Sequence, residues 1–355
     1  GVPGVGIGFT NTFAWTHTVS AGNRFTAYTL TLDPDDPTSY LVDGESRPMT
    51  STFVDVELLQ PDGFTQLEAR YVLETDEGEK IYVVNRGVRY GAPEVLARYP
   101  KLEIVASFGV GYDNVDAKYA AAHGITVCNT PEVLNEEVAD TALGLLLCTV
   151  REFPQAERYL RAGKWLKGGY PLSATLRDRT VGIVGLGRIG KAIAKRVEAF
   201  GVPVVYHSRN SQKDVSYKYY AKLVDMAKDV DTLIVITPGG PATKHLINAE
   251  VLAALGPRGI VINMSRGTVV DDAALIKALR EKTIYSAGLD VFVNEPEVPK
   301  EYLEMENIVL FPHLGSGSVW TRQKMEQLVV DNLLAWNSGK APLTPVPETP
   351  WPPKK

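Results

Sequence analysis

The strongest constraint on the fold is a glycine-rich stretch in the middle of the chain. A β-branched run at Thr180–Val184 predicts a buried strand, and Gly185, Gly187 and Gly190 follow it in G-x-G-x-x-G spacing. A helical pattern of apolar residues comes next, and a second strand is expected at Pro203–Tyr206. A bare glycine motif is weak evidence, but the same motif between a strand and a helix is typical of a dinucleotide site.

The three glycines have separate tasks in such a site. One allows a tight turn, one leaves room for the pyrophosphate, and one allows close contact between helix and strand. The helix N-terminus offers free N–H groups at the positive end of its dipole. We therefore expect the cofactor to bind at the glycines and at Arg188 and Ile189 beside them.

The end of the second strand indicates which nucleotide is preferred. Sites for NAD usually have a carboxylate there to bind the ribose 2′-OH. This chain has His207, Ser208, Arg209 and Asn210, with no carboxylate before Asp214. An arginine can pair with a 2′-phosphate, and Ser208 and Asn210 can donate hydrogen bonds to it. The sequence therefore favours NADP(H), with NAD(H) possible; the alternative is that Arg209 is an ordinary solvated arginine.

Apolar runs alternate with helical patterns through the rest of this region. The expected strands are Thr180–Val184, Pro203–Tyr206, Thr232–Ile236, Gly259–Met264, Tyr285–Asp290 and Ile308–Phe311. Such alternation predicts the α/β class and a doubly wound parallel Rossmann sheet, with its strands' carboxyl ends along one edge. We assign residues 130–312 to this domain and expect a long helix at Glu132–Arg151 near its start.

Three polar residues, Arg266, Glu295 and His313, come just after three of the expected strands. Reduction of a 2-oxo acid needs a cation for the carboxylate, an acid for the ketone oxygen and a carboxylate to orient that acid. Arg266 matches the first task, His313 the second and Glu295 the third. Taken singly, each also has a structural explanation: a loop ion pair, a turn at Asn-Glu-Pro, or a histidine satisfied by its neighbours.

Composition excludes several other classes. The net charge of −5 argues against a general nucleic-acid or membrane-surface binder, and no apolar run is long enough to span a bilayer. The two cysteines, Cys128 and Cys148, suggest buried thiols in a reducing cytoplasm. The five histidines show no metal-ligand spacing, so no metal is expected.

The N-terminal part has a different character. Residues 1–23 suggest irregular structure, whereas residues 25–32 and 53–59 alternate as strands do. Two further strands, at 67–75 and 80–85, suggest a hairpin. The phrases LLQPDG, EARYVLETDEG and IYVVNRGVRYGAPEVLAR over residues 24–98 resemble a bacterial family of unknown function that forms a small β-barrel. We therefore expect residues 1–96 to be β-rich and barrel-like.

From about residue 97 to residue 350 the chain resembles the D-2-hydroxyacid dehydrogenases, especially their glyoxylate/hydroxypyruvate reductase branch. The phrases that carry the resemblance are SFGVGYDNVD, NTPEVLNEEVADTALGLLL, VGIVGLGRIG, NMSRGTVVDDAALIKAL, AGLDVFVNEP and FPHLGSGS. It implies that Arg266, Glu295 and His313 are the family's substrate arginine, glutamate and acid/base histidine.

The resemblance also implies further binding residues. Val110 and Gly111 match the loop whose N–H groups bind the substrate carboxylate. Thr237 and Pro238 match residues that line the cofactor cleft, and Asp290 matches the one that binds the nicotinamide amide. Family members are usually homodimers paired through the nucleotide domain.

The chain departs from the family before residue 97, where the β-rich segment replaces most of the usual flavodoxin-like substrate domain. Residues 97–129 remain of that domain, a helix within 313–340 returns to it, and 341–355 form a proline-rich tail. Such a chain suggests a fusion or chimera. The leading hypothesis is an NADPH-dependent reductase of a small 2-oxo acid such as glyoxylate or hydroxypyruvate, giving the D-2-hydroxy acid. The alternative is a catalytically impaired NADP-binding fusion protein or a nucleotide-sensing binding protein.

Overall fold

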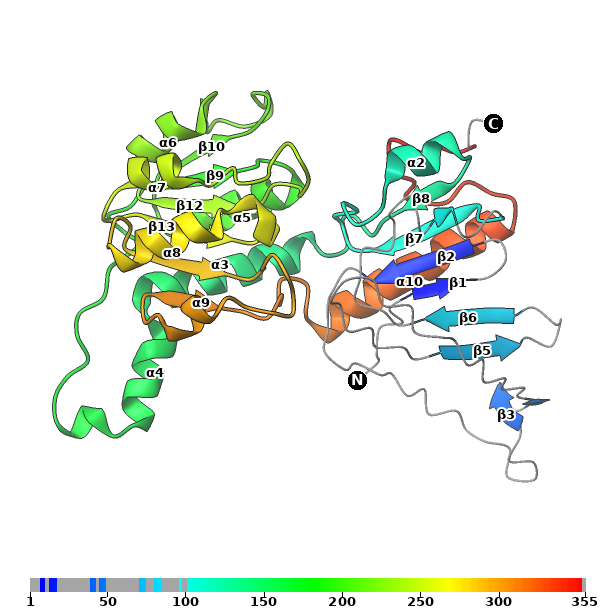
Figure 1. Ribbon diagram of the computed structural model, residues 1–355, viewed down its shortest axis with the longest axis horizontal. Helices are drawn as coiled ribbons and strands as arrows, with labels where there is room; N and C mark the ends of the chain where they lie inside the picture. The colour runs from blue at the N-terminus through cyan, green and yellow to red at the C-terminus, as the bar shows by residue number, and fades with distance from the viewer. Residues whose placement is uncertain are drawn as a thin grey trace. The chain divides into compact units, whose positions relative to one another are not determined.

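The structure is a computed structural model that describes residues 101–352 continuously and, before them, six short strands and residues 96–97 (Figure 1). The chain divides into two compact units. Unit 1 contains Gly1–Pro131 and Arg322–Lys355, and unit 2 contains Glu132–Thr321. The boundaries thus fall after residues 131 and 321, where the sequence suggested 129 and 312.

Unit 2 is built on a sheet of seven parallel strands in the order β11-β10-β9-β12-β13-β14-β15. The strands are β9 (Val181–Val184), β10 (Val204–His207), β11 (Lys218–Tyr220), β12 (Thr232–Val235), β13 (Ile260–Asn263), β14 (Ser286–Leu289) and β15 (Ile308–Leu310). All six expected strands are confirmed, and the doubly wound parallel sheet with them. The sequence missed β11, a short edge strand whose residues are polar or aromatic and none of them fully buried.

Two groups of helices pack beside this sheet. Helices α3 (Asn135–Arg151) and α5 (Arg188–Glu198) contact each other, and α6 (Leu223–Asp229), α7 (Ala249–Leu255) and α8 (Asp272–Arg280) form a second packed series. Short helix α9 (Lys300–Glu304) precedes β15. Because the crossovers of a parallel sheet are right-handed and the strand order reverses between β9 and β12, the two groups cover opposite faces.

Helix α3 begins later than its apolar pattern suggested. We expected a helix from Glu132, but that residue has φ of 70° and the helix starts at Asn135. A turn, closed by the Asn135 N–H on the Glu132 carbonyl oxygen (3.1 Å), lies between them. Farther on, α4 (Phe153–Arg161) and a 3₁₀ turn at Lys164–Leu166 extend away from the sheet (Figure 1).

Unit 1 contains a six-stranded sheet in the order β5-β6-β1-β2-β7-β8. Its strands are β1 (Ile7–Phe9), β2 (Phe13–His17), β5 (Arg70–Glu74), β6 (Lys80–Val84), β7 (Ile104–Phe108) and β8 (Thr126–Cys128). Helix α2 (Ala117–Ala122) joins β7 to β8, and these two strands are parallel. Strands β3 (Ser39–Val42) and β4 (Glu45–Pro48) form a separate antiparallel pair.

This sheet corrects two expectations and confirms one. The prediction of irregular structure for residues 1–23 is wrong, because β1 and β2 pair as an antiparallel hairpin. The described N-terminal strands also do not form a barrel of their own. Strand β2 pairs in parallel with β7, so these strands belong to the same sheet as β7 and β8. The expected hairpin of β5 and β6 is confirmed. The strands expected at 25–32 and 53–59 lie outside the described residues.

The C-terminal segment is built into unit 1. After α10 (Val319–Asn337), the tail runs along β8, where the Val346 N–H donates to the Val127 carbonyl oxygen (2.8 Å). The Val127 N–H in turn donates to Thr349 Oγ1 (2.8 Å). The tail thus satisfies backbone groups that the edge of a sheet leaves open, and Val346 joins the apolar core of the unit.

Candidate active site

The glycine motif forms the turn between β9 and α5. Gly185 has φ of 101°, and a Cβ placed on it would lie 2.8 Å from the Ile236 carbonyl oxygen. A Cβ on Gly190 would lie 2.1 Å from the Gly185 carbonyl oxygen. Only glycine fits either position, because a side chain would collide with backbone atoms that cannot move aside. A Cβ on Gly187 would meet nothing within 4 Å.

The open side of this turn fits a pyrophosphate group. Gly187 precedes the first residue of α5, so the N–H groups of that first turn are available to an anion. Arg188 and Gly187 are exposed there, and Ile189 is half-buried. Arg188 forms an ion pair with Glu132, which lies three residues before the start of α3. The motif residues therefore provide the donors, the charge and the space that a dinucleotide needs.

The residues expected to choose the nucleotide lie after β10. Ser208 is half-buried and donates from Oγ to the Asn210 carbonyl oxygen (2.7 Å), while Arg209 and Asn210 are exposed. The next carboxylate, Asp214, pairs with Lys191 on α5 (2.6 Å). This pairing and hydrogen bond keep the pKa of Asp214 below its usual value. The residues after β10 thus present the cation of Arg209, whereas the next carboxylate along the chain, Asp214, is paired with Lys191.

The loop after β12 faces the glycine turn. Gly185 approaches both Ile236 and the methyl group of Thr237, and Pro238 is exposed just beyond. Because β9 and β12 are adjacent strands on either side of the reversal in strand order, this is the topological switch point where doubly wound sheets bind ligands.

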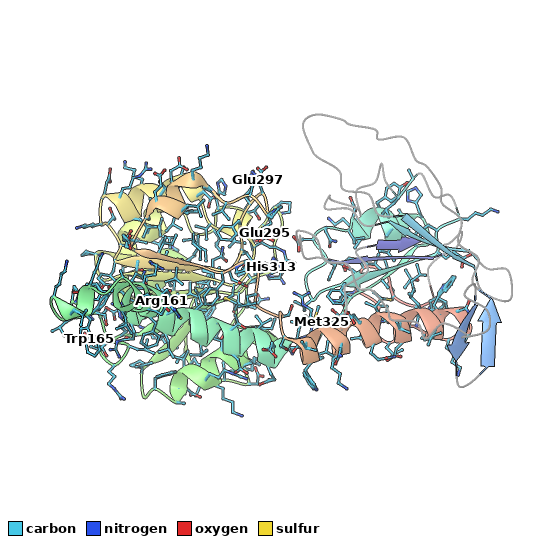
Figure 2. All side chains as sticks on the ribbon, turned by 90° about the horizontal axis from the view of Figure 1, so that it is seen from below. Arg161, Trp165, Glu295, Glu297, His313 and Met325 are labelled. Atoms are coloured by element: carbon cyan, nitrogen blue, oxygen red, sulfur yellow. The ribbon has the colours of Figure 1, made fainter. Side chains whose placement is uncertain are left out.

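The structure brings together two of the three expected catalytic residues. His313 Nδ1 lies 2.7 Å from Glu295 Oε2, and both side chains are mostly buried, with exposed fractions of 19% and 16%. Figure 2 shows the two residues side by side at one end of unit 2. Since the carboxylate holds Nδ1, Nε2 is the imidazole nitrogen left for a substrate.

Both members of this pair are held by backbone groups. Glu295 Oε1 accepts from the Phe292 N–H (2.8 Å), which orients the carboxylate. The His313 N–H donates to the Asp290 carbonyl oxygen (2.9 Å), and His313 has φ of 51°. The histidine is thus fixed relative to the end of β14.

Asp290 is buried at the same strand end, with an exposed fraction of 1%. Its carboxylate accepts from the Leu314 N–H (2.6 Å) and from the Gly315 N–H (2.9 Å). Burial raises the pKa of this carboxyl, and the Leu314 N–H partly offsets the rise. In the structure its side chain therefore organises the loop after His313; a role toward the nicotinamide amide stays a prediction.

Arg266 follows β13 and is half-buried. Its Nη1 donates to the Ser265 carbonyl oxygen (3.0 Å). Gly267, which sequence reasoning did not single out, lies against the loop that carries Glu295, where a Cβ would be 2.0 Å from the Phe292 carbonyl carbon. This close approach brings the arginine and glutamate loops together. The sequence signal that could have identified Gly267 is its position directly after a candidate catalytic residue.

Val110 and Gly111 belong to unit 1, in the loop after β7. Asn129 Nδ2 donates to the Val110 carbonyl oxygen (2.8 Å), and the Gly109 N–H donates to Thr130 Oγ1 (2.9 Å). Gly109 has φ of 147°. Residues that follow β8 therefore fix the path of this loop.

The described residues lack two further kinds of feature. No group of three or more histidine, cysteine, aspartate or glutamate residues there could hold a metal ion. Among the helices of the same residues, none is long and apolar enough to cross a membrane.

Most of the chain is similar to proteins that are already known. The family model for the D-isomer specific 2-hydroxyacid dehydrogenase NAD binding domain matches residues 143–315. A glyoxylate/hydroxypyruvate reductase A of Arabidopsis thaliana is 47% identical over 283 residues, which cover 80% of this chain and 90% of the relative. A glyoxylate reductase of Pyrococcus horikoshii is 43% identical over 260 residues, 71% of this chain and 78% of the relative.

A solved structure agrees with these relatives. An NADPH-dependent glyoxylate/hydroxypyruvate reductase from Sinorhizobium meliloti, in complex with NADP and malonate, is 58% identical with a TM-score of 0.71. The similarity covers 72% of this chain and 81% of that one. Residues 1–126 match a different family model, that of penicillin amidase. The chain belongs to the D-isomer specific 2-hydroxyacid dehydrogenases, and unit 2 carries the NAD-binding domain of that family.

Proposed function

We propose that this chain catalyses the NADPH-dependent reduction of a small 2-oxo acid, such as glyoxylate or hydroxypyruvate, to the D-2-hydroxy acid. The observation that carries the proposal is the His313–Glu295 pair, which lies at the same edge of the parallel sheet as the glycine turn. The relatives in Arabidopsis thaliana and Pyrococcus horikoshii, named as reductases of these acids, support the choice of substrate.

The proposed chemistry divides among the residues of the site. NADPH, when bound, supplies a hydride to the carbonyl carbon. The guanidinium of Arg266 binds the substrate carboxylate. Substrate binding by the N–H groups of Val110 and Gly111 stays a prediction. His313 donates the proton from Nε2 to the ketone oxygen, and Glu295 stabilises the protonated imidazole through Nδ1. Each group thus acts on charge that is present on the substrate or develops as it is reduced.

The proposed cofactor preference depends on the residues after β10. Arg209 is exposed, as a residue that binds a 2′-phosphate must be, and Ser208 precedes it; NAD(H) remains a possible second cofactor. The NADP complex of the 58% identical Sinorhizobium meliloti enzyme supports NADP(H). Thr237, Pro238 and Asp290 would line the nicotinamide side of the same cleft.

The direct test is to follow NADPH oxidation with a panel of 2-oxo acids, beside a titration of NADPH binding. We expect turnover with glyoxylate or hydroxypyruvate. His313→Ala should lose roughly a hundred- to ten-thousand-fold in rate because the proton donor is gone. The affinity for NADPH should stay the same. Unaltered turnover in that variant would show that His313 is not the acid.

A second candidate function follows from the N-terminal match. Residues 1–126 match the penicillin amidase model, which supports the proposal of a fusion in which another segment replaces most of the usual substrate domain. In this candidate NADPH binds but turnover is impaired, because misplacing substrate by ~1 Å costs about a hundred-fold in rate. NADPH binding without turnover would favour it, and a flavodoxin-like segment restored ahead of Pro100 should then raise the rate at least ~10-fold.

We also propose a homodimer paired through unit 2. Apolar side chains gather on α4 and the segment after it: Phe153, Leu160, Trp165, Leu166 and Leu172 are all exposed. Leu166 is 94% exposed and Trp165 66%, and Figure 2 shows Trp165 at the periphery of the unit. An apolar group of this kind is typical of a surface that binds another protein, and most soluble oligomers are pairs of identical chains.

Analytical ultracentrifugation tests the dimer. Leu166→Glu should shift the protein toward monomer, whereas Leu303→Glu, at an apolar position on α9 that is 65% exposed, should not. A monomeric parent protein would contradict the proposal.

The expected location is the cytoplasm. Both cysteines of the sequence are free thiols, Cys128 buried and Cys148 half-buried, as is usual in a reducing compartment. Fractionation of cells that produce the chain checks this expectation.

A further inference from the structure

Asn263 is the last residue of β13 and lies three positions before Arg266. Its side chain is buried, with an exposed fraction of 1%. Nδ2 donates to the Arg266 carbonyl oxygen (3.0 Å), and Oδ1 accepts from the Ser265 N–H (3.1 Å). One carboxamide therefore holds the backbone of the two residues at the tip of this loop.

The same backbone supports the guanidinium. Arg266 Nη1 donates to the Ser265 carbonyl oxygen (3.0 Å), which belongs to the peptide between the two groups that Asn263 binds. A change in the orientation of that peptide would move the carbonyl oxygen on which the guanidinium rests. Asn263 is thus linked to the arginine head group through one peptide unit.

The loop is also tied to its neighbours. Ser265 Oγ donates to the Thr237 carbonyl oxygen (2.5 Å), which connects it to the loop of the cofactor cleft. The Asp290 N–H donates to the Asn263 carbonyl oxygen (3.0 Å), which connects the loop to the end of β14, where the Asp290 carbonyl oxygen accepts from the His313 N–H (2.9 Å). Asn263 therefore lies where the arginine, the histidine and the cofactor loop are joined.

We propose that Asn263 is a positioning residue that sets the place of Arg266 for the substrate carboxylate; this inference rests on the proposed reductase function. An amide is suited to this task because it donates and accepts at the same time. Alanine would leave a buried N–H and a buried carbonyl oxygen without that partner. Ionised aspartate would aim an acceptor at the Arg266 carbonyl oxygen, whereas protonated aspartic acid can donate as the amide does.

The test compares Asn263→Ala and Asn263→Asp with a control, Asn307→Ala. Asn307 precedes β15 in the same unit, and its Nδ2 also donates to backbone carbonyl oxygens, those of Leu279 (3.1 Å) and Tyr285 (3.4 Å). That residue lies at the opposite edge of the sheet, at the strands' amino ends. The control thus loses a comparable hydrogen-bonding side chain at a distance from the site.

For Asn263→Ala we expect a higher KM for the 2-oxo acid, a lower kcat and a ten- to hundred-fold loss in kcat/KM, as a displacement of ~1 Å produces. The affinity for NADPH should not change. Asn307→Ala should keep the parent's KM even if its melting temperature falls. For Asn263→Asp, the ratio of its kcat/KM to that of the parent should fall as the pH rises and the new carboxyl ionises.

Three results would overturn the inference: a kcat/KM for Asn263→Ala within about two-fold of the parent, a loss confined to NADPH affinity, or a ratio for Asn263→Asp that does not vary with pH. Calorimetric titration of oxamate into the NADPH-bound protein supplies a readout that needs no turnover, and Asn263→Ala should bind oxamate more weakly. A parent that neither turns over nor binds oxamate would contradict the proposed function instead. In that case a crystal structure of Asn263→Ala decides, because an unmoved Arg266 would refute the positioning role.

Discussion

Glu295 Oε2 and His313 Nδ1 are 2.7 Å apart, although the residues are 18 positions apart in the sequence and come from loops after different strands. Strands β14 and β15 are neighbours and parallel, so their carboxyl ends deliver both side chains to one place. The second carboxylate oxygen is held by the Phe292 N–H. A glutamate with this support can stabilise a protonated imidazole without moving.

The first prediction concerns the charge of that glutamate. Glu295→Gln keeps the size of the side chain but replaces a charge-assisted hydrogen bond with a neutral one. The difference is about 1–2 kcal/mol, so kcat should fall roughly 5- to 30-fold. NADPH affinity should be unchanged. Glu297→Gln, at an exposed position in the same loop (Figure 2), is the control and should behave as the parent does; equal kcat in both variants would exclude a catalytic charge at Glu295.

The second prediction concerns the nucleotide. Arg209→Ala should weaken NADPH binding far more than NADH binding, because only NADPH carries the 2′-phosphate. A hydrogen bond to a charged group contributes about 1.5–3 kcal/mol, which corresponds to roughly a ten- to hundred-fold loss. Fluorescence titration with both cofactors measures this loss, and NADH serves as the internal control. Equal weakening of the two would refute the assignment.

The third prediction separates two glycines of one motif. Gly190→Ala places a Cβ 2.1 Å from the Gly185 carbonyl oxygen, so the backbone must move, and we expect a loss of about 1–3 kcal/mol or more in the free energy of unfolding. Gly187→Ala meets nothing within 4 Å and should leave the melting temperature unchanged. It should nevertheless weaken NADPH binding, since the new methyl group occupies the approach of the pyrophosphate. The prediction is wrong if Gly187→Ala destabilises the protein, or if Gly190→Ala leaves its stability unchanged.

The fourth prediction concerns alkaline pH. Burial raises the pKa of the Cys128 thiol from its ordinary 9.0 to about 12. Between these values the unfolded chain has lost the proton that the folded chain still holds. The free energy of unfolding should therefore fall as the pH rises through this range, by about 1.4 kcal/mol per pH unit for this one group.

Urea titrations at several pH values measure that slope. Cys128→Ala should make it shallower, because the group responsible is removed. Cys148→Ala should change it less, since the Cys148 thiol is only half-buried. An identical slope in the parent and in Cys128→Ala would show that the thiol ionises equally well in both states.

Much of unit 2 could be predicted from the sequence because its signals are local. Each buried strand is a short apolar run, and the turn after β9 needs glycines at fixed spacing. Strand β11 could not be predicted in this way, because it is an edge strand that is not fully buried and its residues Lys218–Tyr220 do not form an apolar run. The start of α3 could not be predicted from the apolar pattern either, because the backbone at Glu132 turns before the helix begins.

The sequence by itself determined the nucleotide-binding turn and the parallel sheet, and it predicted Arg266, Glu295 and His313 as catalytic candidates, since each depends on a residue type at the end of a recognisable strand. Only the tertiary structure decided which contacts hold these residues in place. They are the contact of His313 with Glu295, the close approach of Gly267 to Phe292, and the hydrogen bond of Asn263 to the Arg266 backbone. Two of these depend on distances between loops that are set by the packing and register of β13, β14 and β15. The third depends on the direction of a buried amide, and neither a loop-to-loop distance nor a side-chain direction has a signature in the local order of residues.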